Sequence, residues 1–184
     1  MKIWYLWLLI IGLATVNIFL LRQNAQLRDQ AEIRKPPALQ IGETVQPFSG
    51  IGLSGERIEI DYSNNSKKRL FLYFAPSCKY CGQQFPDWKE MLKQISSDQI
   101  EVFGIVSENE KQSEVDNYLH SFDCDSDSAT PLRVIFASTE TLQNYKLNVT
   151  PTSLLISPNG KSEKVWTGKW NNNEKENAFA LIKQ

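Results

Sequence analysis

The sequence predicts an α/β fold in which a central mixed β-sheet is flanked by helices, behind an N-terminal apolar helix. Through residues 70–145, short apolar runs of strand length alternate with segments in which apolar residues recur at helical spacing. Residues 152–167 have the pattern of two strands joined by a Pro-Asn-Gly turn, and a last helical segment follows at 173–182. Alternating strands and helices favour parallel strands covered on both faces, whereas the hairpin adds antiparallel strands.

The same patterns locate the individual elements. Strands are expected at residues 70–75, 100–106, 132–137, 152–157 and 161–167, with two more short strands around a glycine turn within 50–60. Helices are expected at residues 82–97, 110–121, 139–145 and 173–182. No internal repeat or low-complexity block interrupts them.

Composition narrows the class of protein. The chain has 184 residues, enough for one domain of ordinary size with appendages. Its formal net charge of −1 argues against a nucleic-acid partner, which would require a basic face. Three cysteines are too few for a disulfide framework, so an apolar core must hold the domain together.

The N-terminal segment is long and apolar enough to cross a membrane. Residues 3–21 are nineteen residues without a charge, and a helix rises about 1.5 Å per residue. Trp4, Tyr5 and Trp7 gather near one end, where amphipathic rings favour the membrane interface. A secretory signal peptide is the alternative, but its apolar region would be shorter, and no convincing small-residue cleavage site follows. We therefore expect an uncleaved anchor.

The chain then divides into three parts. Residues 1–21 are the predicted transmembrane anchor, and residues 22–40 a polar stalk that Pro36 and Pro37 stiffen at its end. Residues 41–184 carry the globular pattern and form the predicted domain.

Two cysteines at a strand–helix junction are the strongest candidates for chemistry. Cys78 and Cys81 follow the apolar run at 70–75, and a helical pattern opens at the second cysteine. Cys78 is thus expected at or just before a helix N-terminus, where free N–H groups and the helix dipole stabilise a thiolate. The neighbouring Lys79 should lower the Cys78 pKa further. This arrangement indicates thiol–disulfide exchange, with Cys78 attacking and Cys81 resolving the mixed disulfide.

A metal site is the alternative interpretation of this cysteine spacing. Zinc sites share the spacing but usually need a second pair of ligands. His120 and Cys124 are the remaining candidates, so a copper or zinc chaperone using Cys78 and Cys81 with one or both of them stays open. On its own, Cys124 lies among aspartates that should raise its pKa, and we expect an unpaired bystander thiol. His120 is expected to be a solvated or capping residue.

Residues 40–170 resemble membrane-anchored thioredoxin-fold proteins of the TlpA/ResA type, the bacterial extracytoplasmic thiol–disulfide oxidoreductases. The resemblance rests on the opening Ile41-Gly42-Glu43, the strand–CxxC–helix unit, Pro86 five residues past the second cysteine, and the run from Tyr145 through Thr150-Pro151 to Gly160. It implies a thioredoxin fold, no organic cofactor and no metal. In the family, the proline that matches Pro151 is cis and packs beside the cysteine pair.

The resemblance also implies a substrate surface, partners and a location. Pro151 and Thr150 would shape the surface that receives a substrate strand, together with Lys79 and Tyr80 between the cysteines. The partners would be proteins with disulfides or thiols and an upstream membrane or extracytoplasmic electron donor. The location implied is the bacterial cytoplasmic membrane, crossed once, with the domain facing the periplasm or cell exterior. The resemblance favours a reductase.

Several positions depart from the family pattern. Gln84 stands where members dedicated to cytochrome c maturation have an acidic residue, and Leu72 where thioredoxins hold a buried acid. Ser77 replaces the usual tryptophan, and Lys79-Tyr80 is neither the thioredoxin nor the maturation-reductase dipeptide, its tyrosine being similar to that of bacterial disulfide isomerases. These departures leave a disulfide oxidant or isomerase as an alternative.

The basic residues give a conflicting indication of orientation. Lys2 precedes the apolar segment, whereas Arg22, Arg28, Arg34 and Lys35 follow it. A plain count therefore leaves the domain in the cytoplasm. We follow the resemblance, which places it outside.

Overall fold

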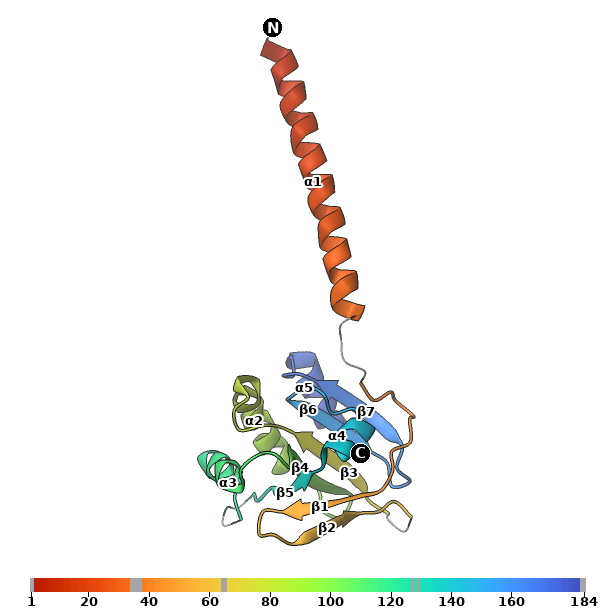
Figure 1. Ribbon diagram of the computed structural model, residues 1–184, viewed down its shortest axis with the longest axis vertical. Coiled ribbons are helices and arrows are strands. Elements are labelled where there is room, and N and C mark those ends of the chain that lie inside the picture. Colours follow the sequence, from red (N-terminus) through yellow and green to blue (C-terminus); the bar gives the residue numbers. More distant parts are fainter. Residues whose placement is uncertain (1, 34–37, 64–65, 127, 129, 183–184) are drawn as a thin grey trace. The chain divides into compact units, whose positions relative to one another are not determined.

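A computed structural model describes residues 2–33, 38–63, 66–126, 128 and 130–182. The chain divides into two compact units, residues 1–36 and 37–184 (Figure 1). The first unit is the helix α1 (Lys2–Ile33). Within it, Ile3–Leu27 has a mean hydropathy of 2.1 and is able to cross a membrane by length and composition, criteria that a signal sequence also meets. Its described apolar side chains are exposed all round the helix, a distribution typical of a membrane span.

The second unit is built on one seven-stranded sheet with the order β2-β1-β5-β4-β3-β6-β7 (Figure 1). The strands are β1 (Phe48–Gly52), β2 (Arg57–Ile60), β3 (Lys68–Tyr73), β4 (Ile100–Ser107), β5 (Arg133–Ala137), β6 (Thr152–Ile156) and β7 (Ser162–Thr167). The helices are α2 (Lys79–Leu92), α3 (Gln112–Ser121), α4 (Thr139–Asn144) and α5 (Asn172–Leu181). Strands β3, β4 and β5 are parallel, and all the other pairings are antiparallel. The predicted mixed sheet is therefore confirmed.

Two apolar clusters cover opposite faces of this sheet. Leu70 and Leu72 of β3 pack in one cluster with buried residues of α2, α3 and α5. Phe71, which points to the other face, packs with Tyr145 at the end of α4 and with the N-terminal segment of the domain. This alternation explains why β3 reads as a continuous apolar run, because both of its faces are buried.

The two elements that flank the cysteines begin and end earlier than predicted. Strand β3 begins at Lys68 because its backbone pairs with β4 from Lys68 opposite Ile100, ahead of the apolar run. It ends at Tyr73 rather than 75. Helix α2 spans Lys79–Leu92 rather than 82–97, because Cys78 caps its first turn.

Candidate active site

Cys78 is the N-cap of α2. Its φ and ψ of −81° and 111° are extended, and its Sγ accepts a hydrogen bond from the Cys81 N–H at 3.3 Å. A turn precedes it, in which the Cys78 N–H donates to the Ala75 carbonyl at 3.0 Å. The chain therefore leaves the carboxyl end of β3, turns once, and presents the sulfur to the free N–H groups of the helix. The predicted position of Cys78 just before a helix N-terminus is confirmed.

A proline loop lies against this sulfur. The Thr150–Pro151 peptide bond is cis, and the Cys78 Sγ donates a hydrogen bond to the Thr150 carbonyl at 3.5 Å. The sheet brings the two segments together, because Thr152 of β6 pairs with Tyr73 at the end of β3. Pro151 itself is buried, and its carbonyl accepts a hydrogen bond from the Gly168 N–H at 2.7 Å. The cis proline beside the cysteine pair, expected from the resemblance, is present.

The two thiols of the pair differ in exposure and in acidity. Both cysteines are reduced; Cys78 is partly exposed, whereas Cys81 is 0% exposed. Burial works to raise the Cys78 pKa, but hydrogen bonds with Cys81, with the Thr150 side chain and with the Tyr80 backbone outweigh it, so the pKa is lowered. Burial, followed by the interaction with Cys78, raises the pKa of Cys81 to about 12. At neutral pH the accessible sulfur is thus the better nucleophile.

Lys79 and Tyr80 both lie on the surface beside Cys78. The Tyr80 side chain is 60% exposed, and Lys79 is exposed as well. The lowering of the Cys78 pKa is due mainly to hydrogen bonds, so the predicted direction was right, but the Lys79 charge is not among its leading causes. An ammonium group at the surface is well screened by water and exerts little effect on a nearby thiol.

The positions next to the pair that carry acids in related proteins are apolar or neutral here. Gln84 and Leu72 are both fully buried, and the Gln84 Oε1 accepts a hydrogen bond from the Trp170 N–H at 2.7 Å. No carboxylate is among the buried polar side chains of the described residues. The proton of Cys81 therefore has no buried carboxylate acceptor in this part of the chain.

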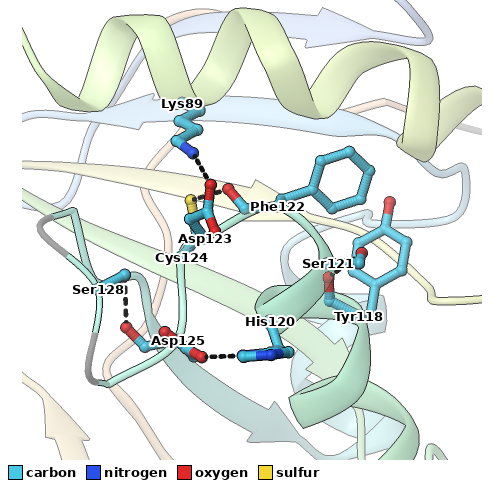
Figure 2. Close-up of polar contacts among 9 residues, drawn as sticks. All are labelled: Lys89, Tyr118, His120, Ser121, Phe122, Asp123, Cys124, Asp125 and Ser128. Carbon is cyan, nitrogen blue, oxygen red and sulfur yellow. Dashed lines mark hydrogen bonds and ion pairs between the residues drawn. The ribbon is translucent and has the colours of Figure 1, made fainter.

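The side chains considered as further metal ligands make contacts of their own (Figure 2). The His120 Nδ1 lies 2.6 Å from the Asp125 Oδ2, and the Cys124 Sγ donates to the Phe122 carbonyl at 3.6 Å. Across the ranges listed above, no three or more His, Cys, Asp or Glu side chains come together as a metal site would require. The ligand set that the metal interpretation needs is not assembled.

Cys124 has a raised pKa, as its sequence context predicts, but for a different reason. Its side chain is 0% exposed, and burial is the largest cause of the shift. The Lys89 charge works in the opposite direction, and the charges of Asp123 and Asp125 contribute less than burial does. The sequence could not show this, because burial depends on how the loop after α3 packs against α2.

The contact of His120 with Asp125 predicts a small pH dependence of stability. Hydrogen bonding to Asp125, and then its charge, raise the His120 pKa. A raised folded-state pKa means that the stabilisation is fully present below the unfolded-state pKa and is lost as pH rises through the folded value. We expect His120→Gln to lower the urea midpoint at about pH 5.5 but not at about pH 8.5, on either side of the ordinary histidine value. The effect should be small, because the histidine is 81% exposed.

An equal effect of His120→Gln at both pH values would contradict this assignment. Asp125→Asn is the matched variant, because it removes the charge and keeps a hydrogen-bond acceptor. It should reproduce the pH dependence of His120→Gln, and the two changes combined should cost no more than either alone.

One residue near the cysteines was not singled out from the sequence. Tyr118 of α3 has a buried hydroxyl, and its ring lies 5.3 Å from that of Phe85, one turn beyond Cys81 on α2. In the sequence, a tyrosine at helical spacing indicates an ordinary core residue. Its position near the cysteines depends on the packing of α3 against α2.

Comparisons with known proteins agree with the fold. Residues 41–164 match the model of the AhpC/TSA family. Thiol-disulfide oxidoreductase ResA of Bacillus subtilis (strain 168) is 30% identical over 131 residues, covering 71% of this chain and 69% of that protein.

Two solved structures illustrate the shared fold. A thioredoxin-family thiol:disulfide interchange protein of Chlorobium tepidum matches with a TM-score of 0.60 at 21% identity, covering 79% of this chain and 99% of that one. StoA of Bacillus subtilis matches with a TM-score of 0.57 at 20% identity, covering 80% and 98%. The chain therefore belongs to the AhpC/TSA family, and it is a thiol–disulfide oxidoreductase with the thioredoxin fold.

Proposed function

We propose that this protein is a membrane-tethered reductase that exchanges disulfides with other proteins outside the cytoplasm, using Cys78 and Cys81. One observation carries the proposal. A partly exposed sulfur with a lowered pKa caps α2 beside a cis-proline loop, and a second thiol lies buried one turn behind it. That asymmetry supports a fixed order of events, because a substrate reaches Cys78 first.

The reaction balances with these two thiols alone. The Cys78 thiolate attacks one sulfur of a substrate disulfide, forming a mixed disulfide and releasing the other substrate sulfur as a thiolate that takes up a proton. Cys81 then gives up its proton and attacks the Cys78 Sγ. The mixed disulfide breaks, the Cys78–Cys81 disulfide forms, and the second substrate thiol leaves. Two electrons have passed from the protein to the substrate.

The surface around Cys78 is the proposed substrate-binding surface. Pro151 has no N–H, so the loop cannot close a sheet hydrogen bond at that point, and the partly exposed Thr150 precedes it beside the sulfur. In this proposal, Thr150 and Pro151 contact the backbone of an extended substrate segment. The exposed Tyr80 and Lys79 would contact the side chains of that segment.

The direction of electron flow is inferred from the balance of effects on the thiols. Strong oxidants of this chemistry owe their potential to a reduced form that a strongly depressed nucleophile pKa stabilises. Here burial opposes the hydrogen bonds at Cys78, and the pKa of Cys81 rises to about 12. The Cys78 thiolate therefore stabilises the reduced form of the pair only to a limited extent. This favours a reductase over an oxidant or isomerase.

The tether is inferred from the first unit of the chain, and its orientation from the family resemblance. The apolar helix that includes Ile3–Leu27 supports a single-pass anchor, residues 1–21, in the bacterial cytoplasmic membrane, and residues 22–40 would link it as a stalk to the domain 41–184. Each turnover leaves Cys78 and Cys81 as a disulfide, so a reductase outside the cytoplasm must be reduced again after it. An electron donor in or beyond the membrane is therefore a required partner, alongside the substrate proteins.

The reduction potential of the Cys78–Cys81 pair tests this proposal. The full-length Cys124→Ser variant in detergent, free of metal, is equilibrated with thiol buffers, and the oxidised fraction is followed by thiol labelling. We expect a value near that of thioredoxin, about −270 mV. A value near about −120 mV would mean an oxidant or isomerase. If no reversible disulfide forms, the exchange function itself fails, and binding of Cu⁺ or Zn²⁺ by the unmodified chain becomes the next measurement.

A further inference from the structure

The hydroxyl of Tyr118 is buried without a hydrogen-bond partner among the described residues. Buried tyrosine hydroxyls normally find a partner, and an unsatisfied one is destabilising. The aromatic ring is well packed: it stacks on Phe74 with the centroids 5.6 Å apart and meets the edge of Phe85 at 5.3 Å. Phe122 packs beside it at 5.1 Å (Figure 2). Ring packing alone would be served as well by phenylalanine, so the hydroxyl calls for a separate explanation.

These ring contacts place the Tyr118 ring against residues that flank the cysteine pair in the sequence. Phe74 lies four residues before Cys78, at the turn out of β3, and Phe85 lies four residues after Cys81, on the same face of α2. Tyr118 is partly buried and packs against the apolar cluster that contains Cys81, which is fully buried. Burial, then the charges of Cys81 and Cys78, raise the pKa of Tyr118, so the phenol stays protonated and remains a donor.

Other titratable groups near Tyr118 are already accounted for. On α2, the Lys89 Nζ donates to Asp123 at 2.9 Å, and beyond α3 the Cys124 Sγ donates to a backbone carbonyl. On α3 itself, His120 is paired with Asp125. At the end of β3, Tyr73 is partly exposed. Of the titratable groups named here, Tyr118 is the buried donor without a partner; among the described residues, the Gln84 Nε2 and the indole N–H groups of Trp166 and Trp170 are also buried donors without one.

The resolving step creates a need for such a donor. Cys81 must become a thiolate in order to attack Cys78, yet its thiol is fully buried and its pKa is about 12. A thiolate in an apolar environment needs hydrogen-bond donors to offset the lost hydration. In the reduced form described here, the Tyr118 hydroxyl makes no hydrogen bond, which leaves it available when charge develops on that sulfur.

We propose that Tyr118 is a further participant in disulfide exchange, whose hydroxyl donates a hydrogen bond to the Cys81 sulfur as it becomes a thiolate and resolves the mixed disulfide. This inference rests on the proposed function. Tyr118 accepts no proton: Cys81 loses its proton to the departing sulfur or to solvent, the mixed disulfide breaks, and the Cys78–Cys81 bond forms. The hydroxyl lowers the barrier by stabilising the charge on Cys81 before that bond is made.

A two-phase thiol assay separates the two steps. Reduced full-length Cys124→Ser protein in detergent is mixed with excess dithiobis(nitrobenzoate), a disulfide whose thiol product is coloured. The first product molecule reports attack by Cys78, and the second reports resolution by Cys81. We expect Tyr118→Phe to slow the second phase about tenfold or more at neutral pH, because a hydrogen bond to a charged group is lost. The pH–rate profile of the second phase should move to higher pH, while the first phase stays unchanged.

Stability provides the second readout, with Tyr145→Phe as the matched control. Tyr118→Phe removes an unsatisfied hydroxyl, so its urea midpoint should equal or exceed that of the parent protein. Tyr145→Phe removes hydrogen bonds to the Tyr62 hydroxyl and to the Gln46 carbonyl, both 2.8 Å, on the opposite face of the sheet. It should lower the urea midpoint and leave both kinetic phases as they were.

The possible outcomes separate this inference from the proposed function. If the parent protein shows no first phase, the proposed function fails. If both phases occur in the parent and Tyr118→Phe leaves the rate and pH profile of the second phase unchanged, the role of Tyr118 is refuted while the proposed function stands. A lowered urea midpoint with an unmoved pH profile would mean a structural role only and would also refute it.

Discussion

Changing Cys81 to serine is expected to stop disulfide exchange after its first step and to leave the substrate covalently attached to Cys78. Cys78 is partly exposed with a lowered pKa, so it still attacks a substrate disulfide, whereas a serine at position 81 cannot attack the mixed disulfide. Turnover should fall by about three orders of magnitude or more, as when a nucleophile is removed from other two-step enzymes. The trapped complex is measured on non-reducing gels of membranes from cells that express the variant, and the captured proteins are identified by mass spectrometry.

Two matched variants give this experiment its controls. Cys78→Ser should capture nothing, because Cys81 is fully buried and its pKa lies far above neutral. Cys124→Ser should behave as the unmodified protein, because Cys124 is 0% exposed and its thiol donates to a neighbouring carbonyl. Capture by Cys78→Ser in place of Cys81→Ser would reverse the assigned roles. The identity of the captured proteins would also show on which side of the membrane the domain meets its substrates.

The local features of this site could be predicted from the sequence because each depends on a short stretch of chain. An apolar run, two cysteines and a helical pattern are enough to place Cys78 at a helix N-terminus, as the structure confirms. The cis Thr150–Pro151 bond came from the resemblance, and the pairing of β6 with β3 explains how the loop reaches the sulfur. Element types were predicted correctly, and the boundaries shifted where capping and strand pairing decided them.

The remaining features depend on contacts between distant segments. The unsatisfied Tyr118 hydroxyl, the hydrogen bond from Trp170 to Gln84 and the burial of Cys124 all require α3 or α5 to be packed against α2. Charges close in sequence were a poor guide for the same reason. The charge of Lys79 is not among the leading causes of the lowered Cys78 pKa, and burial outweighs the aspartates at Cys124.

Replacing Trp88 by alanine is expected to be the most destabilising of the changes considered. Its side chain is fully buried in the centre of α2, and its Nε1–H donates to the Ser153 hydroxyl on β6 at 3.0 Å. Truncation of a buried tryptophan costs about 3–5 kcal/mol, a large share of the 5–15 kcal/mol of a typical domain. Ser153 lies two residues after Pro151, so the same change should loosen the loop that contacts Cys78.

Urea unfolding and the pH dependence of Cys78 alkylation measure the two effects of Trp88→Ala separately. We expect a large fall in the urea midpoint, together with a rise of the Cys78 pKa toward its ordinary value as the hydrogen bond with the Thr150 side chain weakens. Tyr80→Ala is the matched control for stability, because it removes an exposed aromatic ring from the same helix and should change the free energy of unfolding by about 0.5 kcal/mol or less.

Equal destabilisation by the two variants would contradict the packing of α2 against β6. An unchanged Cys78 pKa in a destabilised but folded Trp88→Ala protein would mean that the proline loop keeps its place without Trp88, held by the Gly168 hydrogen bond to Pro151 and by its pairing with β3.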